Sequence, residues 1–485
     1  MTELIRRSTA AQRAFFVALL ALFVAVSIQY SIKVTKGRSA INRWAPQIQQ
    51  IEAGEDINKN YNYPNPPIMA LILWPISELV TFNPVLGALV WFFLKAAMAI
   101  VSMLWVFRLI ETPEKPFPAW AKGLTVALSI RPIIGDLSHG NVNIFILFLV
   151  VASLYAFSRR RDYLSGIALA LAIACKVTPA LFLVYFVWKG AWRAVIGTVI
   201  GLALFFLFVP AAFLGWEQNL QSLKSWIEVM ILPFVVGGYV TPEHNNQSLP
   251  GLIARLCTYA PSFSTYIGDY YVPIRYDNFT DIGTDGAKLL VKGFMGLFAL
   301  LVVWKCRTPI KTLAGAAGSQ QSPSPQRQQG TLLAAEYALI CLGMLLFSER
   351  TWKHHCVVLL LPFAVLCYGL ANAEWSRRRR GAILAVIVGA TLLMATTSTG
   401  LMGENLGRLQ DQATATSMVV GVPGVAAVGQ SGVWTDHPGK IAQVYGAYVW
   451  AFFLLIGGLG MMLRREKADA VTTAIPTDMT FRKAG

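Results

Sequence analysis

Residues 84–107 read PVLGALVWFFLKAAMAIVSMLWVF, and their only charged residue is Lys95. A helix of this length and apolarity can cross the hydrocarbon core of a bilayer, which is about 30 Å thick. The chain repeats such runs on both sides of this stretch. We expect twelve membrane-spanning helices, at residues 14–32, 66–82, 84–107, 120–135, 141–157, 163–187, 194–214, 287–304, 332–347, 355–371, 381–399 and 445–463. The sequence therefore predicts an all-α polytopic membrane protein.

The composition excludes a soluble domain. Of the 485 residues, 55% are hydrophobic and 14% are charged, and the mean hydropathy is +0.53. A typical soluble chain carries about a quarter charged residues. The apolar runs also exclude disordered, coiled-coil, collagen-like and disulfide-rich secreted proteins. The six cysteines are far apart and show no CxxC or Cys/His ligand spacing, so we predict neither a disulfide framework nor a metal site.

The net charge of +16 would suggest a nucleic-acid partner if the chain were soluble. In a membrane protein, a basic excess instead reflects topology and attraction to anionic lipid headgroups, so we expect membrane lipids and no nucleic acid as partners. With both termini in the cytoplasm, Lys and Arg are about twice as dense in the inner segments, as the positive-inside rule requires. This arrangement places 372–380 inside and 108–119 outside. It also places the basic cluster at 159–161 outside, which is an exception to the positive-inside rule.

We expect a single transmembrane domain over residues 14–463, between a cytoplasmic N-terminus (1–13) and a cytoplasmic tail (464–485), in the cell membrane. Basic residues before the first span are typical of a signal peptide, but no convincing small-residue cleavage site follows, so we expect a retained signal anchor. Residues 306–331 include a Gln/Ser/Pro-rich stretch, so we expect a disordered cytoplasmic linker. Long loops are uncommon unless they are functional, and the outer face carries three, at 33–65, 215–286 and 400–444.

The first outer loop predicts an amphipathic helix at residues 41–51. Its apolar residues recur at positions i, i+3, i+4 and i+7, the pattern of a helix that lies in the membrane interface with its apolar face toward lipid. Gly54 would end this helix, which leaves Glu52 and Asp56 near the outer membrane surface. The alternative is a solvated turn next to a belt of aromatic residues such as Tyr63.

A second candidate site is the turn at 348–355, SERTWKHH, between two apolar runs. Arg350 and Lys353 could neutralise a phosphate, and His354 and His355 could hydrogen-bond to it or transfer a proton. Such a set suits an anionic headgroup. The alternative is an ordinary hairpin turn whose cations extend to the membrane surface.

Lys176 interrupts an otherwise apolar run shortly before Pro179. A lysine at the centre of a membrane helix costs about 3 kcal/mol on insertion scales, so it requires a partner. This pair could recognise a phosphate or a sugar in a cavity, because proline also frees a backbone carbonyl. The alternative is a lysine paired with a structural carboxylate or carbonyl. Lys95 has the same two interpretations.

Two further segments are rich in small polar groups. Residues 136–143, DLSHGNVN, join two short helices, and Asn141 and Asn143 suit either a turn or a ligand. Residues 243–248, EHNNQS, carry consecutive amides that suit sugar hydroxyls, because an amide both donates and accepts. Such amides are equally common as loop polar groups.

In this order the motifs resemble glycosyltransferase family 87 of the GT-C superfamily, whose members are polytopic transferases that use polyprenyl-phosphate sugars. The family's Gly followed by tyrosines and prolines matches Gly54, Tyr61, Tyr63, Pro64, Pro66 and Pro67. Its Gly-Gln-x-Asn corner, with Asn in place of Gln, and its Lys-x-x-Pro match Gly140, Asn141, Asn143, Lys176 and Pro179. Its Trp-x-His-His turn matches Trp352, His354 and His355, after Ser348.

The resemblance implies a GT-C-like helical bundle that moves a hexose, of the mannose type, from a polyprenyl-phosphate donor to a lipid or glycan acceptor with inversion. It implies no cofactor. The residues that it places at the substrate are Lys176, Trp352, Arg350, His354, Tyr63, Asn141 and Asn143, with His355 in a catalytic role.

The family usually has a catalytic aspartate early in the first outer loop, but residues 14–51 contain no acidic residue. Asp56 or Glu52 would then have to deprotonate the acceptor. The alternative function is a transporter or lipid flippase, which favours inverted repeats and matching broken helices in the two halves. The sequence shows no internal repeat.

Overall fold

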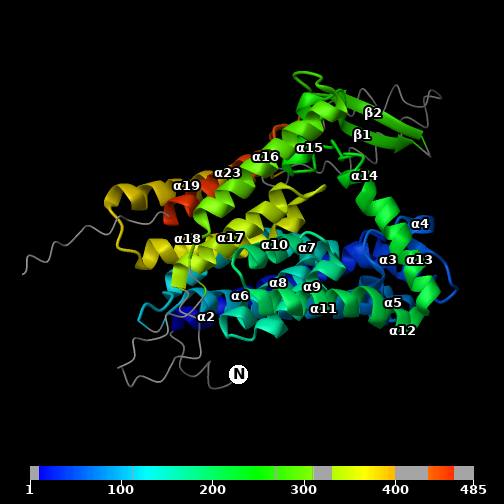
Figure 1. Cartoon of the computed structure of the whole chain (residues 1–485), viewed down its shortest axis with the longest axis horizontal. Helices are drawn as coiled ribbons and strands as arrows, with labels where there is room; N and C mark the ends of the chain where they lie inside the picture. Colours follow the sequence, from blue (N-terminus) through cyan, green and yellow to red (C-terminus); the bar gives the residue numbers. More distant parts are fainter. Residues whose placement is uncertain are drawn as a thin grey trace, which may run out of the picture.

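The computed structural model describes residues 10–112, 114–267, 270–308, 310, 330–398 and 435–463. Within these ranges, the helices long and apolar enough to cross a membrane are Val17–Thr35, Pro84–Ile110, Trp192–Leu214, Gly283–Lys305, Lys353–Asn372 and Arg377–Thr396, with Pro438–Val444 and Ala447–Met462 as a further pair bent by 61°. The chain is therefore a multi-pass membrane protein built almost entirely of helices (Figure 1). Most of the predicted linker, most of the predicted cytoplasmic N-terminus, the predicted cytoplasmic tail and most of the loop at 400–444 lie outside the described residues.

The quoted stretch forms α6 (Pro84–Ile110), which begins and ends close to its predicted limits. The Asn83 side chain accepts hydrogen bonds from the backbone N–H groups of Val85 and Leu86, at 3.0 and 3.1 Å. Pro84 occupies the first turn, where a missing N–H costs nothing. The neighbouring long helices in the first half are α2 (Ala10–Thr35), α7 (Ala119–His139) and α8 (Asn143–Ser158).

The predicted amphipathic helix is present as α3 (Ala40–Gln49), but its apolar face does not lie against lipid. Ile48 and Ile51 are 0% and 5% exposed, because α3 packs on α5 (Pro67–Phe82). With α4 (Ile57–Tyr61), these helices gather at one end of the bundle, as Figure 1 shows. The prediction of the helix was correct, and the prediction of its environment was wrong, because α5 covers the face that would otherwise meet lipid.

The predicted single span at 163–187 is two helices, α9 (Asp162–Cys175) and α10 (Ala180–Trp188). They run in opposite directions along α8. Lys176, at their junction, contacts Asn143 at the start of α8, whereas Phe186 of α10 contacts Phe157 near its end, with ring centroids 4.8 Å apart. The lysine and proline that interrupt the apolar run therefore form the tip of a helical hairpin.

The segments at 108–119 and 372–380 lie at the same end of the bundle, contrary to the predicted arrangement. Lys115 Nζ is 3.2 Å from Glu374 Oε1, and the Tyr368 hydroxyl donates to the Lys115 carbonyl at 2.6 Å. The turn at 159–161 lies at this end too, since Tyr155 stacks on Trp105 near the end of α6, with centroids 5.4 Å apart. The error arose because α5 stays beside α3 instead of crossing the membrane, so every helix after it runs in the direction opposite to the predicted one. The α9–α10 hairpin, predicted as one span, adds a second reversal and returns the later helices to their predicted directions.

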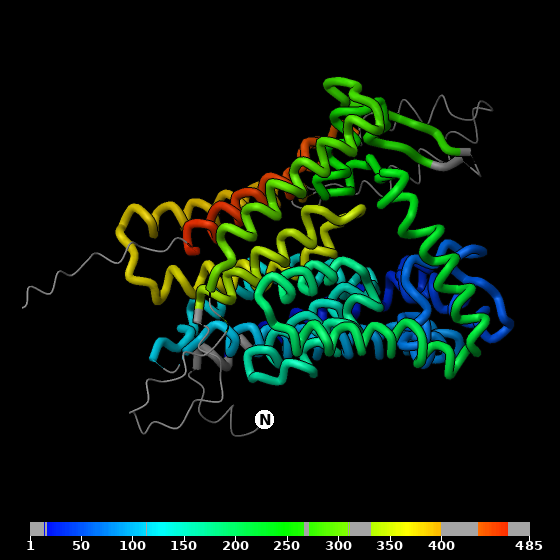
Figure 2. Tube along the Cα trace, in the orientation of Figure 1, coloured from blue at the N-terminus to red at the C-terminus, as the bar shows by residue number. Residues whose placement is uncertain are grey.

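From residue 283 onward, the second half adds a layer of helices that Figure 2 shows running diagonally past the first half. Its 3₁₀ helix η3 (Lys353–Leu359) and α18 (Leu360–Asn372) pack on α7. The predicted outer loop at 215–286 also contains a β-hairpin that the sequence analysis did not predict. The elements of this half are α11 (Trp192–Ala203), the π-helix η1 (Leu204–Phe208), α12 (Val209–Leu214), α13 (Trp216–Trp226), the π-helix η2 (Ile227–Ile231), α14 (Leu232–Val235), α15 (Leu249–Cys257), the antiparallel β1 (Pro261–Ile267) and β2 (Tyr270–Tyr276), α16 (Gly283–Lys305), α17 (Gly330–Leu346), α19 (Arg377–Thr396), α22 (Pro438–Val444) and α23 (Ala447–Met462).

Candidate active site

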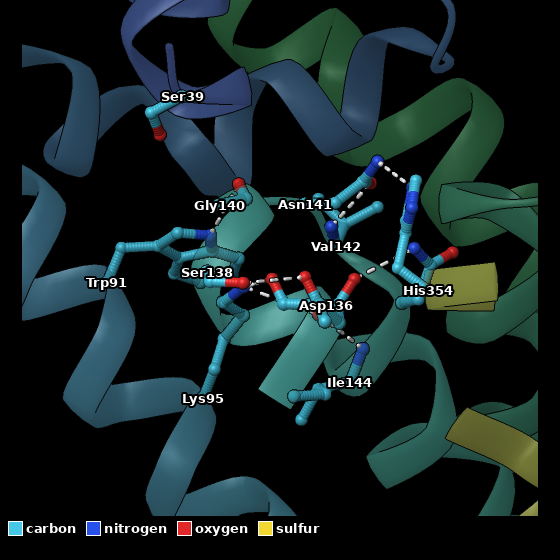
Figure 3. A network of polar contacts seen from close by, with 12 residues as sticks. Ser39, Trp91, Lys95, Asp136, Ser138, Gly140, Asn141, Val142, Ile144 and His354 are labelled. Carbon is cyan, nitrogen blue, oxygen red and sulfur yellow. Dashed lines mark hydrogen bonds and ion pairs between the residues drawn. The ribbon is translucent and has the colours of Figure 1, made fainter. Parts of the chain in front are cut away.

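The corner between α7 and α8 is the scaffold of the site. Gly140 ends α7 with a φ of +71°, a left-handed conformation that side chains disfavour. A Cβ at this position would lie 2.5 Å from the Tyr30 hydroxyl oxygen and closer still to Ser39 Oγ. Trp91 donates its indole N–H to the Gly140 carbonyl at 3.2 Å (Figure 3). The corner is therefore fixed from α2, α3 and α6 at once.

A buried ion pair lies directly below this corner. Lys95 Nζ is 3.3 Å from Asp136 Oδ2, and both side chains are 0% exposed. The lysine also donates to the Asp136 carbonyl at 2.7 Å, and the carboxylate accepts from the Ile144 N–H at 3.2 Å (Figure 3). Buried charges are tolerated when such hydrogen bonds satisfy them. Lys95 thus has a structural carboxylate as its partner.

Asn143 connects this ion pair to Lys176. Its Nδ2 donates to Asp136 Oδ1 at 2.8 Å, and its Oδ1 accepts from Lys176 Nζ at 2.6 Å. Asn143 and Lys176 both line a pocket together with residues of α8, α17, η3 and the turn between α17 and η3, among them Ser348, Thr351 and His355. Among the described residues, the direct partner of Lys176 is a neutral amide, so the pocket carries a cation without a contacting carboxylate.

The turn at 348–352 and η3 are held by the loop that precedes α15. Asn246 donates to the Glu349 carbonyl at 2.9 Å and accepts from the Thr351 N–H at 3.0 Å. The backbone N–H of Gln247 donates to the Thr351 carbonyl at 2.7 Å. Both amide side chains are 0% exposed. Of the amides at 243–248 that could have bound sugar hydroxyls, the Asn246 side chain therefore positions this turn, and the Gln247 side chain donates instead to the carbonyls of His244 and Gln443.

The two histidines of the turn have different neighbours. His354 Nε2 is 3.3 Å from Asn141 Nδ2, and its ring lies edge-on to that of His139 with centroids 4.3 Å apart (Figure 3). His355 stacks on Trp352, with centroids 5.8 Å apart, and its Nδ1 is 3.2 Å from the Arg350 carbonyl.

Arg350 completes this part of the site, since its guanidinium carbon lies 5.6 Å from the centre of the Trp352 ring. Trp352, His354 and His355 thus face the α7–α8 corner and the tip of the α9–α10 hairpin as one aromatic and basic group.

The carboxylates of the first loop belong to a separate part of the site. Asp56 caps α4 by accepting from the Lys59 N–H at 3.1 Å, while its other oxygen, Oδ2, is buried and has no hydrogen-bond partner among the described residues. Glu52 is exposed. Lys59 also lines a polar cleft between α4 and the α13–η2 segment, with Gln221, Lys224, Ser225, Glu228 and Val229.

Tyr63 packs inside the first loop. Its side chain is 0% exposed and contacts Trp44 edge-on, with centroids 6.0 Å apart. Burial raises the pKa of the Tyr63 hydroxyl. The buried hydroxyl makes Tyr63 a wall residue of this loop.

The structure thus gathers seven predicted residues around the α7–α8 corner, the hairpin tip and the 348–355 turn, namely Asn141, Asn143, Lys176, Arg350, Trp352, His354 and His355. Asp56 and Glu52 lie in the first loop, where the described contacts are local. The sequence analysis did not assign Lys95, Asp136 and His139 to the site. The lysine and the aspartate are 41 positions apart, so no motif spacing connects them. Their pairing could have been predicted only from the fact that each is a charge flanked by apolar runs.

Comparison with known proteins identifies the family of this chain. A sequence model of glycosyltransferase family 87 matches residues 63–319. A polyprenol-phosphate-mannose-dependent alpha-(1-2)-phosphatidylinositol mannoside mannosyltransferase of Mycobacterium tuberculosis is 26% identical over 72% of this chain and 71% of its own length. Its counterpart in Mycolicibacterium smegmatis is 25% identical over 74% of this chain and 65% of its own length.

A polyprenol-phosphate-mannose-dependent alpha-(1-2)-phosphatidylinositol pentamannoside mannosyltransferase of Mycolicibacterium smegmatis is 28% identical over 64% of this chain. The match spans 62% of that relative, slightly less than two thirds of its length. The family match includes the α7–α8 corner and the Lys176 hairpin, and covers more than half of the chain. This chain belongs to glycosyltransferase family 87.

Proposed function

We propose that this chain is a membrane-embedded mannosyltransferase that moves mannose from a polyprenyl-phosphate donor to a lipid-linked glycan acceptor. The family and the relatives' activities support the donor and the acceptor class. The observation that carries the proposal is the Lys176 pocket. Its ammonium group contacts a neutral amide oxygen at 2.6 Å, which leaves its charge available to an anionic ligand such as a lipid phosphate.

The donor site would use the basic and aromatic residues around this pocket. Lys176 would contact the phosphate, and Arg350 and Trp352 would extend the site toward the outer membrane surface. In the transfer step, the anomeric C–O bond breaks and its electron pair leaves with the phosphate, so negative charge grows on the phosphate oxygens. A fixed cation at that point stabilises the transition state more than the ground state.

His354, His355, Asn141 and Asn143 would complete the substrate contacts. The imidazoles can donate to or accept from sugar hydroxyls, and the Asn141 amide near His354 can do both. His355 lines the pocket next to Lys176, which favours a role at the phosphate rather than at the acceptor.

We assign the proton-accepting step to the first loop. The acceptor hydroxyl oxygen attacks the anomeric carbon from the face opposite the phosphate, and its proton passes to a carboxylate. Asp56 is the first candidate, because Oδ2 is buried without a partner among the described residues. The cleft lined by Lys59 lies beside it and would hold acceptor hydroxyls. Glu52, which is exposed, is the second candidate.

We place the reaction at the outer face of the cell membrane, with both termini in the cytoplasm and residues 14–463 as one transmembrane domain. The end of the bundle that carries Lys115 and Glu374 also carries the basic turn at 159–161, and basic turns favour the cytoplasmic side. The first loop and α13 lie together at the opposite end, where Gln218 donates to the Ile51 carbonyl at 3.1 Å.

The test is transfer by the purified full chain in lipid nanodiscs. Radiolabelled polyprenyl-phosphate mannose and a phosphatidylinositol mannoside are supplied together, with a water-soluble nucleotide-activated mannose as the control donor. We expect labelled lipid product from the polyprenyl donor alone. Donor binding without transfer to this or any other lipid-linked glycan would instead favour a transporter or flippase.

A further inference from the structure

We propose that Asp136 is a positioning residue for donor binding, which acts through Asn143 on the Lys176 ammonium group. This inference rests on the proposed function, since it takes the donor phosphate as the ligand of Lys176. It concerns a residue that never contacts the substrate, because the Asp136 side chain is 0% exposed. Its effect would pass through two hydrogen bonds to the wall of the pocket.

The first step is the orientation of the Asn143 amide. An amide has one donating and one accepting end. Asp136 Oδ1, which can only accept when ionised, holds the Nδ2 end at 2.8 Å. The carbonyl end therefore points to Lys176, where it accepts at 2.6 Å. If the amide were reversed, two N–H donors would face the lysine, and the ammonium group would lose its anchor.

The second step is that the two Asp136 oxygens have different partners. Oδ2 receives the Lys95 ammonium at 3.3 Å and the Ile144 N–H at 3.2 Å. Oδ1 is left for Asn143. Oδ2 therefore neutralises Lys95, and Oδ1 orients the Asn143 amide. A carboxylate that served Lys95 alone would not need its second oxygen at the start of α8.

The third step concerns charge. Asp136 could have contacted Lys176 directly and cancelled its charge, as it does for Lys95. The inserted amide instead fixes the position of the Lys176 ammonium group while leaving its charge uncancelled by direct contact. A fixed, uncompensated cation binds an anion without first breaking an ion pair, which lowers the cost of reorganisation on binding. The arrangement fits a reversible phosphate contact.

The main test is Lys95→Met/Asp136→Leu, which removes the buried pair as a unit. Replacing a buried ion pair by apolar side chains of similar volume is often tolerated for folding. We expect a folded protein whose KM for polyprenyl-phosphate mannose rises about 10- to 100-fold, the usual effect of losing a charge-assisted hydrogen bond. The KM for the acceptor should not change. A donor KM within twofold of wild type would overturn the proposal.

A matched control is available at the other end of the bundle. Lys189 and Glu336 form a second buried pair, with Nζ 2.8 Å from Oε2, at the end of α10 opposite the Lys176 tip. Lys189→Met/Glu336→Leu should change the midpoint of thermal unfolding but not the donor KM. If both double variants raise the donor KM equally, the effect comes from loosened packing and the inference is wrong.

Asn143→Ala provides a second route if the double variant fails to fold, because it leaves Lys95, Asp136 and Ile144 in contact. It should raise the donor KM to a similar extent. In a Lys176→Ala background, Asn143→Ala and the pair variant should have little further effect, since all act on one ammonium group. Full additivity would contradict the proposed chain of contacts.

Lys176→Ala also distinguishes a failure of the phosphate assignment from a failure of the positioning role of Asp136. If it keeps the wild-type donor KM, the phosphate assignment under the proposed function fails. If it loses donor binding while the pair variant and Asn143→Ala keep it, the assignment of the phosphate stands and the positioning role of Asp136 fails.

Discussion

At the scale of single residues, Asp56 and Asp136 show how environment separates two carboxylates. Both oxygens of Asp136 are engaged, by Asn143 on one side and by Lys95 and a backbone N–H on the other. Asp56 uses one oxygen to cap α4 and leaves the other without a partner among the described residues. A base needs a free lone pair near its substrate. Asp56 has such a lone pair, which supports its proposed role, whereas Asp136 would have to break its contacts first.

Asp56→Asn isolates the basic function from the capping function. Asparagine caps helices about as well as aspartate, so α4 should remain folded. We expect the rate of transfer to fall about 10²- to 10⁴-fold while the donor KM stays near wild type. Steady-state kinetics of this variant and of Glu52→Gln decide between the two carboxylates, since the exposed Glu52 should be dispensable. Wild-type rates in both variants would move the base outside the first loop.

Gly140→Ala should destabilise the corner strongly. The new methyl group would meet Ser39 Oγ and the Tyr30 hydroxyl at less than contact distance, and the backbone would carry a positive φ. Backbone strain of that kind alone costs about 1–3 kcal/mol. Gly54→Ala is the matched control, because Gly54 has a φ of +78° but no atom within 4 Å of its Cβ position. The thermal midpoint should fall further for Gly140→Ala; equal shifts would mean that the corner can relax.

At the scale of elements, sequence patterns predicted where helices lie better than where they turn back. The α6 helix was predictable because apolar length and the Asn83-Pro84 start agree. The run at 163–187 was predicted as one helix, because a hydropathy average is insensitive to one lysine and one proline. Those two residues mark the tip of the α9–α10 hairpin. The β-hairpin escaped prediction because its strands lie within a long loop between apolar spans, where a search for membrane helices assigns no elements.

Asn246 tests whether the loop before α15 positions the 348–355 turn. Asn246→Ala removes the bonds to the Glu349 carbonyl and the Thr351 N–H, and leaves buried backbone groups unpaired. Such a loss costs about 1–3 kcal/mol, and a loosened turn should lower kcat. Asn245→Ala, at the neighbouring exposed position, should change neither quantity. Thermal unfolding measures the stability, and steady-state kinetics measure kcat. If Asn246→Ala and Asn245→Ala have equal kcat, the turn keeps its conformation without the contacts of Asn246.

At the scale of the whole molecule, the candidate site is assembled from segments far apart in sequence. Asn143 and Lys176 are 33 positions apart, and Asn141 and His354 are 213 apart. The order of motifs predicted most of the members, but not their contacts, because contacts depend on how α7, α9 and η3 pack. The buried Lys95–Asp136 pair had no motif of its own. Hydropathy and charge therefore predicted the membrane class and the list of candidates, while packing decided which of them meet.

Packing also changes the predicted sidedness, and this can be tested on the whole chain. Lys115 contacts Glu374 at 3.2 Å, so these loops share one side of the membrane, and we propose that this side is cytoplasmic because the basic turn at 159–161 lies there too. Single cysteines in place of Lys115, Arg160 and Asn60, all at exposed positions, are treated with a membrane-impermeant maleimide in intact cells. Asn60→Cys should be labelled directly, whereas Lys115→Cys and Arg160→Cys should be labelled only after permeabilisation. Labelling of Lys115→Cys in intact cells together with Asn60→Cys would restore the alternation expected from hydropathy and would require α5 to cross the membrane.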